Sequence, residues 1–158
     1  MILKSINNFL FNRKVNKMST IEIICDGGCR NNQDPIKREA YGSFIVKTTA
    51  PLTPSPPIIH RRTYGNRTNN EAEYLALINA LEYVKDTYKG QYIDKLIIKT
   101  DSQLLIGQLS KGWRVKQDHL RDLKIKVGYL VADTLVFPIS GITFEKINEK
   151  DMKAVIGH

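Results

Sequence analysis

The chain has 158 residues, 42% of them apolar and 25% charged, which is the size and composition of one folded domain with its own core. It contains only two cysteines, Cys25 and Cys29, and no apolar run near the roughly 18–20 residues that span a bilayer, which argues against a disulfide framework, a structural zinc site and a membrane helix. The formal net charge of +8 favours polyanionic partners, although solubility alone also accounts for it. We therefore expect a soluble protein that is cytoplasmic or resides in another intracellular compartment.

The N-terminal segment differs in composition from the rest of the chain. Residues 1–17 carry four basic side chains and no acid, and their apolar stretch is too short and interrupted for a secretory signal. We interpret residues 1–18 as a basic extension that is disordered and residues 19–158 as the folded domain. The acid-free, basic character leaves an organellar targeting peptide open as the less favoured alternative.

Three strands and a long helix are predicted in the first half of the folded domain. The apolar run from Ile21 to Asp26 indicates a buried strand that ends at Gly27-Gly28. Residues 40–48 and 58–65 indicate two more strands, joined by a proline-rich loop. Apolar residues at helical spacing predict a helix from about Asn70 to Val84.

The second half alternates between strands and helices. Residues 95–100 predict a strand, which is followed by helices at 104–109 and at about 118–130. One more strand is expected within 136–147, and the last ten residues have a helical pattern. Three strands followed by such alternation predict an α/β fold, in which a mixed sheet carries helices on its faces.

Three acids stand where such a sheet would bring them together. Asp26 and Asp101 each end a predicted strand, and Glu73 begins the apolar stripe of the long helix, whereas Glu71 lies off that stripe and should be solvated. Either aspartate alone would be read as a turn or cap residue. Together, three carboxylates suit Mg²⁺, or Mn²⁺ as a substitute, and a pair of such ions catalyses phosphodiester hydrolysis.

The segments around these acids resemble the three motifs of type 1 ribonuclease H, in the order and with the intervals of that family. The matching segments are Asp26-Gly27-Gly28-Cys29-Arg30-Asn31-Asn32, Thr68-Asn69-Asn70-Glu71-Ala72-Glu73-Tyr74 and Thr100-Asp101-Ser102-Gln103. The resemblance covers roughly residues 20–148 and implies the ribonuclease H-like fold, a five-stranded mixed sheet flanked by helices.

The resemblance also implies an activity and its residues. It implies an endoribonuclease that cuts the RNA strand of RNA–DNA hybrids by a two-metal-ion mechanism, giving 3′-hydroxyl and 5′-phosphate ends. We expect neither a membrane nor an obligate protein partner. Asp26, Glu73 and Asp101 would be the catalytic metal ligands. Substrate contacts are implied for the backbone of Gly27, Gly28, Cys29 and Arg30 and for Asn32, Thr68, Asn69, Asn70 and Gln103.

The C-terminal helix departs from the family pattern. The family has a fourth acid there, and the matching position falls near Val155, which cannot ligate a metal. His158 is our preferred replacement as a catalytic residue, and Asp151 is the alternative, although its position also suits a capping role. If neither replaces the missing acid, the chain would be a catalytically impaired module that binds nucleic acid.

A basic stretch is the last feature that bears on substrate binding. Residues 111–126 carry six basic side chains and the chain's only tryptophan, Trp113. Basic side chains beside an aromatic ring suit a phosphate track. A solvated helix face with Trp113 tucked against the core is an equally good interpretation.

Overall fold

The structure is a computed structural model that describes residues 18–134 and 141–157. The predicted N-terminal extension, residues 1–17, and the candidate ligand His158 lie outside the described residues. None of the helices within the described ranges is long and apolar enough to cross a membrane.

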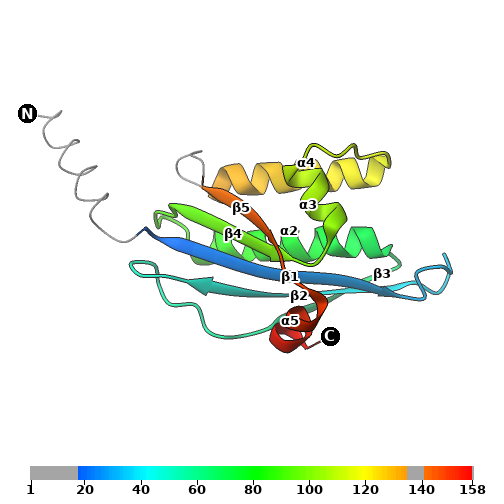
Figure 1. Cartoon of the computed structure of the whole chain (residues 1–158), viewed down its shortest axis with the longest axis horizontal. Helices are drawn as coiled ribbons and strands as arrows, with labels where there is room; N and C mark the ends of the chain where they lie inside the picture. The colour runs from blue at the N-terminus through cyan, green and yellow to red at the C-terminus, as the bar shows by residue number, and fades with distance from the viewer. Residues whose placement is uncertain (1–17, 135–140, 158) are drawn as a thin grey trace, which may run out of the picture.

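Five strands form one mixed sheet (Figure 1) in the order β3-β2-β1-β4-β5. β1 pairs antiparallel with β2 and parallel with β4, β2 pairs antiparallel with β3, and β4 pairs parallel with β5. Their bounds are Thr20–Arg30 for β1, Glu39–Thr48 for β2, His60–Gly65 for β3, Lys95–Thr100 for β4 and Ile142–Lys146 for β5. The mixed sheet predicted from the sequence is confirmed, as is the order of elements along the chain.

Helices cover both faces of this sheet, but unequally (Figure 1). The bounds of the described helices are Asn69–Thr87 for α2, Gln103–Ser110 for α3, Asp118–Thr134 for α4 and Glu149–Ile156 for α5. The apolar side of α2 is buried against the main core, and α4 lies against α2. α5 packs on the opposite face, where Met152 and Ile156 bury against Ile24 of β1. The predicted stripe of α2 is confirmed, since all five of its apolar members are buried: Tyr74, Leu77, Ile78, Leu81 and Val84.

Two differences from the sequence prediction concern β1 and α2. β1 does not stop at the glycine pair but continues to Arg30, because Gly27 and Gly28 still pair with Gly42 and Tyr41 of β2. Glu71 was predicted to be solvated, and this is wrong: the residue is buried, with 7% of its surface exposed. Its carboxylate turns back to accept from the backbone N–H of Thr68 at 2.8 Å, which closes a capping box at the start of α2.

Candidate active site

The end of β1 lies directly against the first turn of α2, and the absence of a side chain at Gly27 makes this approach feasible. A Cβ atom built on Gly27 would lie 2.3 Å from the carbonyl carbon of Ala72 and 2.4 Å from the backbone nitrogen of Glu73. Because both atoms belong to the helix backbone, only glycine fits at this position. Asp26, one residue before Gly27, is therefore held beside the start of α2, where Glu73 stands.

Asp101 reaches the same place from the neighbouring strand. β1 and β4 are parallel and in register from Thr20 with Lys95 to Ile24 with Lys99, and Asp26 and Asp101 each lie two residues beyond the last of these pairs. The carboxyl groups of Asp26 and Asp101 are hydrogen-bonded to each other. The carboxyl ends of the two strands thus meet, as the sequence predicted.

The environment of Asp26 disfavours its negative charge. Burial, followed by the charge of Asp101 and the hydrogen bond with it, raises the pKa of Asp26 to about 7, against a smaller opposing contribution from the backbone N–H of Gly27. Two carboxyl groups this close keep a proton or take up a cation.

Glu73 is positioned by two hydrogen-bond donors. The Ser102 hydroxyl donates a hydrogen bond to Oε2 of Glu73, and the Asn69 side-chain amide donates to Oε1 at 3.3 Å. Burial raises the pKa of Glu73 to about 7; the Ser102 hydrogen bond opposes this shift, whereas the charges of Asp101 and Asp26 add to it. Ser102 thus orients Glu73 in addition to capping α3, a role that its place directly after Asp101 could have suggested.

Glu71, two residues away on the same helix, behaves in the opposite way. Burial alone would raise its pKa, but the backbone N–H of Thr68 and the guanidinium of Arg67 outweigh that effect and hold the pKa below its usual value. The Arg67–Glu71 ion pair measures 3.2 Å. Glu71 is therefore a satisfied structural carboxylate, whereas Glu73 faces the other acids.

The three acids converge, but they do not form a completed ion cage. As the side chains are placed, no group of three or more His, Cys, Asp or Glu within residues 18–134 and 141–157 has the arrangement of a metal site. Instead, Asp26 and Asp101 bond to each other and Glu73 bonds to Ser102.

The predicted substrate-contact residues surround these acids. Asn32 accepts from the backbone N–H of Asn69 at 3.0 Å, and the Cys29 thiol donates to the carbonyl of Arg67 at 3.1 Å. These contacts tie the segment after β1 to the start of α2. Gly28 lies in β1, Thr68 caps α2, Asn70 belongs to its first turn, and Gln103 is the first, exposed residue of α3.

The fourth-ligand position is apolar. Val155 is half-buried and packs with the cluster of Ile24, Met152 and Ile156. Asp151 is exposed at the start of α5, where its carboxylate accepts from the Asn148 side-chain amide at 2.7 Å. The cap of α5 is Asn148, whose side chain accepts from the backbone N–H of Asp151 at 2.8 Å, whereas Asp151 contacts the Asn148 side chain and not its backbone. His158 falls outside the described residues.

The basic stretch combines features of both interpretations that the sequence left open. Trp113 is 48% exposed, yet its ring rests on α3, because a Cβ built on Gly107 would lie 2.1 Å from the indole. One side of the ring is therefore seated on the protein and the other faces solvent.

Comparisons with known proteins point to the same family as the sequence motifs. A family model described as RNase H matches residues 18–148. The ribonuclease HI of Halobacterium salinarum is 38% identical over 106 residues, which are 67% of this chain and 48% of that protein, so the chain spans about half the length of this relative.

Two solved structures show the same fold. The N-terminal RNase H domain of Rv2228c from Mycobacterium tuberculosis, solved as a fusion with maltose-binding protein, is 27% identical with a TM-score of 0.66, covering 86% of this chain and 87% of that chain. LC11-RNase H1, solved in complex with an RNA/DNA hybrid, is 22% identical with a TM-score of 0.66, covering 85% of this chain and 90% of that chain. The fold expected from the sequence is confirmed by these likenesses.

Proposed function

Because the chain belongs to the ribonuclease H family, we propose that it is an endoribonuclease that hydrolyses the RNA strand of RNA–DNA hybrids. The observation that carries this proposal is the convergence of Asp26, Glu73 and Asp101 from β1, α2 and β4, where burial and then the neighbouring acids raise the pKa of Asp26 and Glu73. Structural carboxylates in a fold are normally paired with cations, as Glu71 is. A buried cluster of acids in which Asp26 and Glu73 have raised pKa values points to a site of chemistry.

The donor set fits a divalent cation. Members of this family generally use divalent metal ions, and hard carboxylate oxygens suit Mg²⁺, or Mn²⁺ as a substitute. Asp26, Glu73 and Asp101 would hold it, because a cation stabilises carboxylates whose charge is disfavoured by burial and by their mutual repulsion. When bound, such ions activate water and stabilise the leaving oxygen in phosphodiester hydrolysis.

The chain's own residues would bind and orient the hybrid. Asn69 and Asn70 at the start of α2, with Gln103 at the start of α3, offer short amides to the minor groove, where the 2′-hydroxyl distinguishes RNA from DNA. Ser102 and Asn69 fix the Glu73 carboxylate, which is thereby placed to position the attacking water. Water adds to phosphorus as the bond to the 3′-oxygen breaks, which leaves a 3′-hydroxyl and a 5′-phosphate.

A cleavage assay tests the proposal. RNA labelled at its 5′ end is annealed to DNA and incubated with Mg²⁺, Mn²⁺ or EDTA, with single-stranded RNA and duplex DNA alongside. We expect metal-dependent cutting of the RNA in the hybrid alone and its loss in Asp26→Asn. Equal turnover by a folded Asp26→Asn variant would refute the assignment of the site.

One observation favours a second function, a hybrid-binding module without catalysis. Val155 stands in an apolar cluster where the family has an acid, so the described part of α5 supplies no carboxylate there. This alternative predicts that the wild-type protein binds the hybrid with metal present and leaves the RNA intact.

A further inference from the structure

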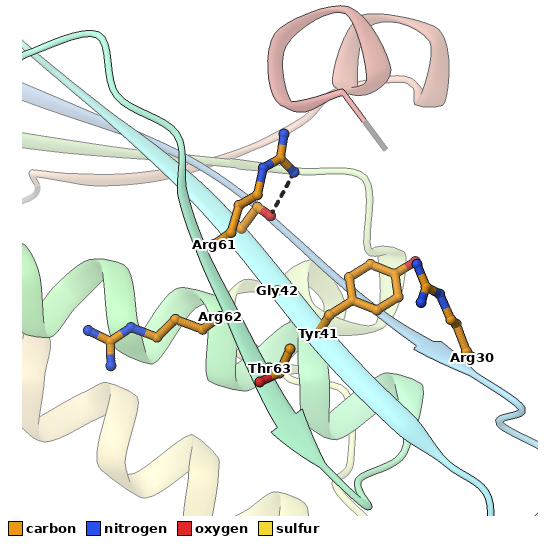
Figure 2. Close-up of a pocket in the computed structure, with 7 residues that line it drawn as sticks. Arg30, Tyr41, Gly42, Arg61, Arg62 and Thr63 are labelled. Carbon is orange, nitrogen blue, oxygen red and sulfur yellow. Dashed lines mark hydrogen bonds between the residues drawn. The ribbon is translucent and has the colours of Figure 1, made fainter.

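A basic groove lies on the α5 face of the sheet (Figure 2). It has a volume of about 680 Å³, and the residues that line it include Arg30 of β1, Tyr41 and Ser43 of β2, and Arg61 and Thr63 of β3. Arg62 also borders it, but its side chain extends to the opposite side of β3 from Arg61 (Figure 2). None of the residues that line the groove is acidic.

Strand register places this groove directly next to Asp26. Side chains alternate along a strand, so Asp26 and Arg30 of β1 point to the same face, with Gly28 between them. Ser43 pairs with Asp26 across β1 and β2, and Arg61 pairs with Ser43 across β2 and β3. The groove therefore begins one strand from Asp26 and extends about 13 Å along β1 to Arg30, a span of a few nucleotides.

The two arginines on this face are held in place by different contacts. The Arg30 guanidinium lies over the Tyr41 ring, 5.9 Å from its centroid, and Gly28 leaves room for that ring, since a Cβ there would lie 2.5 Å from it. Arg61 donates to the Ile156 carbonyl of α5 at 2.8 Å and to Ser43 at 3.5 Å. Each guanidinium is thus positioned at the groove with further N–H donors to offer.

We propose that this groove binds the sugar–phosphate backbone of the RNA strand beside the cleavage point, with Arg30 and Arg61 as the phosphate contacts. The inference rests on the proposed function, because it takes the scissile phosphate of the RNA to lie at Asp26. A strand that passes Asp26 continues over the same face, where a guanidinium fork suits a phosphate. The phosphates of the DNA strand are the competing ligand, and hybrids with neutral linkages in one strand or the other distinguish the two.

Three variants change the groove without removing a structural contact of α5. Arg30→Gln removes one charge, Arg30→Lys retains it, and Thr63→Glu adds a negative charge at an exposed position that pairs with Tyr41. Matched controls lie elsewhere: Lys89→Gln removes one exposed charge beyond the far end of α2, and Thr143→Glu adds one to the opposite edge strand.

Binding is measured in the Asp26→Asn background, which separates it from cleavage, as the dependence of hybrid affinity on salt concentration. Losing one phosphate contact makes the slope of log affinity against log salt shallower by about 0.9. The ratio of the parent's hybrid affinity to that of the Arg30→Gln variant should therefore shrink about 3.5-fold between 50 and 200 mM salt. We expect this for Arg30→Gln, a larger loss for Thr63→Glu, and near-parental slopes for Arg30→Lys and both controls.

Hybrids with uncharged methylphosphonate linkages identify the strand. Neutral linkages beside the cleavage point of the RNA strand should abolish the difference between Arg30→Gln and its parent, whereas neutral linkages in the DNA strand should preserve it. The reverse pattern overturns the assignment to RNA.

The two proposals fail differently. If wild-type protein cuts the hybrid but Arg30→Gln binds like Lys89→Gln, the groove proposal is overturned and the proposed function stands. If wild-type protein neither cuts nor binds the hybrid, both are overturned.

Discussion

Replacing Asp26 by asparagine should abolish activity and yet stabilise the protein in EDTA at neutral pH. The reason is that Asp26 is held against Asp101 in a partly buried site that disfavours its charge. Asparagine has nearly the same shape, carries no charge, and can donate a hydrogen bond to Asp101. The substitution therefore removes repulsion while leaving the packing unchanged.

The magnitude follows from the pKa. A rise from 3.8 to about 7 is roughly three pH units, which corresponds to about 4 kcal/mol at most. Because the Asp26 side chain remains partly open to solvent, screening reduces the effect, and we expect Asp26→Asn to raise the free energy of unfolding by about 1–2 kcal/mol.

The pH dependence has a definite sign. Folding raises the pKa of Asp26, so its contribution to stability is fully present below about pH 4 and is lost as the pH rises through about 7. In EDTA, the advantage of Asp26→Asn should therefore be absent near pH 4 and complete above pH 7. Millimolar Mg²⁺ should narrow the gap at pH 7.5 by stabilising only the wild-type acid cluster.

Glu71→Gln is the matched control with the opposite sign. Its pKa is lowered in the folded protein, so the stability it contributes is present above the pKa of the unfolded chain, near 4.5, and is lost as the pH falls. Glu71→Gln should therefore destabilise the protein at pH 7.5.

Urea unfolding followed by circular dichroism measures the stability of the Asp26→Asn and Glu71→Gln variants. An Asp26→Asn variant that is less stable than wild type in EDTA at pH 7.5 would refute the electrostatic reasoning.

Three further substitutions test how the site is held. Gly27→Ala should cost about 3 kcal/mol, because its Cβ would collide with the backbone of α2, whereas Gly128→Ala, with nothing within 4 Å in α4, should gain about 0.5–1 kcal/mol. Urea unfolding compares the two, and equal effects would contradict the close approach of β1 to α2. Ser102→Gly keeps an adequate helix cap but frees Glu73, so kcat/KM should fall about tenfold with a stability loss of only a few tenths of a kcal/mol. Unchanged turnover would exclude an orienting role for the hydroxyl. Gly107→Ala should displace the Trp113 ring from α3, shift its fluorescence to longer wavelength and weaken hybrid binding, and an unshifted spectrum would contradict the seating of the ring.

Much of the fold was predictable because it follows local patterns. The five-membered apolar stripe of α2 and the runs of apolar residues in the strands carry their own periodicity, so the elements and their order followed from the sequence. The three acids could also be predicted from the sequence, since two of them follow predicted strands and the third begins the apolar stripe of α2.

One error arose where a tertiary contact outweighed the local signal, and another where a local cap did. The glycine pair indicated the end of a strand, but Gly27 and Gly28 serve close packing against α2 and Tyr41 while their backbone continues to pair with β2. Glu71 was expected in solvent because its position off the apolar stripe was weighed alone, although Thr68 three residues before it forms the capping-box pattern that turns this carboxylate back onto its own helix. The groove at Arg30 and Arg61 was also missed, since it forms only when three strands align.

A gain-of-function substitution at Val155 tests whether the lack of an acid at this position limits catalysis. This residue packs against the apolar cluster that contains Ile24, which lies on the same face of β1 as Asp26 and two residues before it, so an acid at position 155 would lie near the three acids. Val155→Asp places a charge in a half-buried apolar site and should cost about 1–3 kcal/mol of stability. If the absent acid limits catalysis, the variant should cut the hybrid several-fold faster at saturating Mg²⁺, whereas Val155→Asn should bear a similar packing cost without the gain. Turnover of Val155→Asp that is no higher than that of Val155→Asn would mean that the three acids on β1, α2 and β4 suffice, and that α5 contributes only its packing on the sheet.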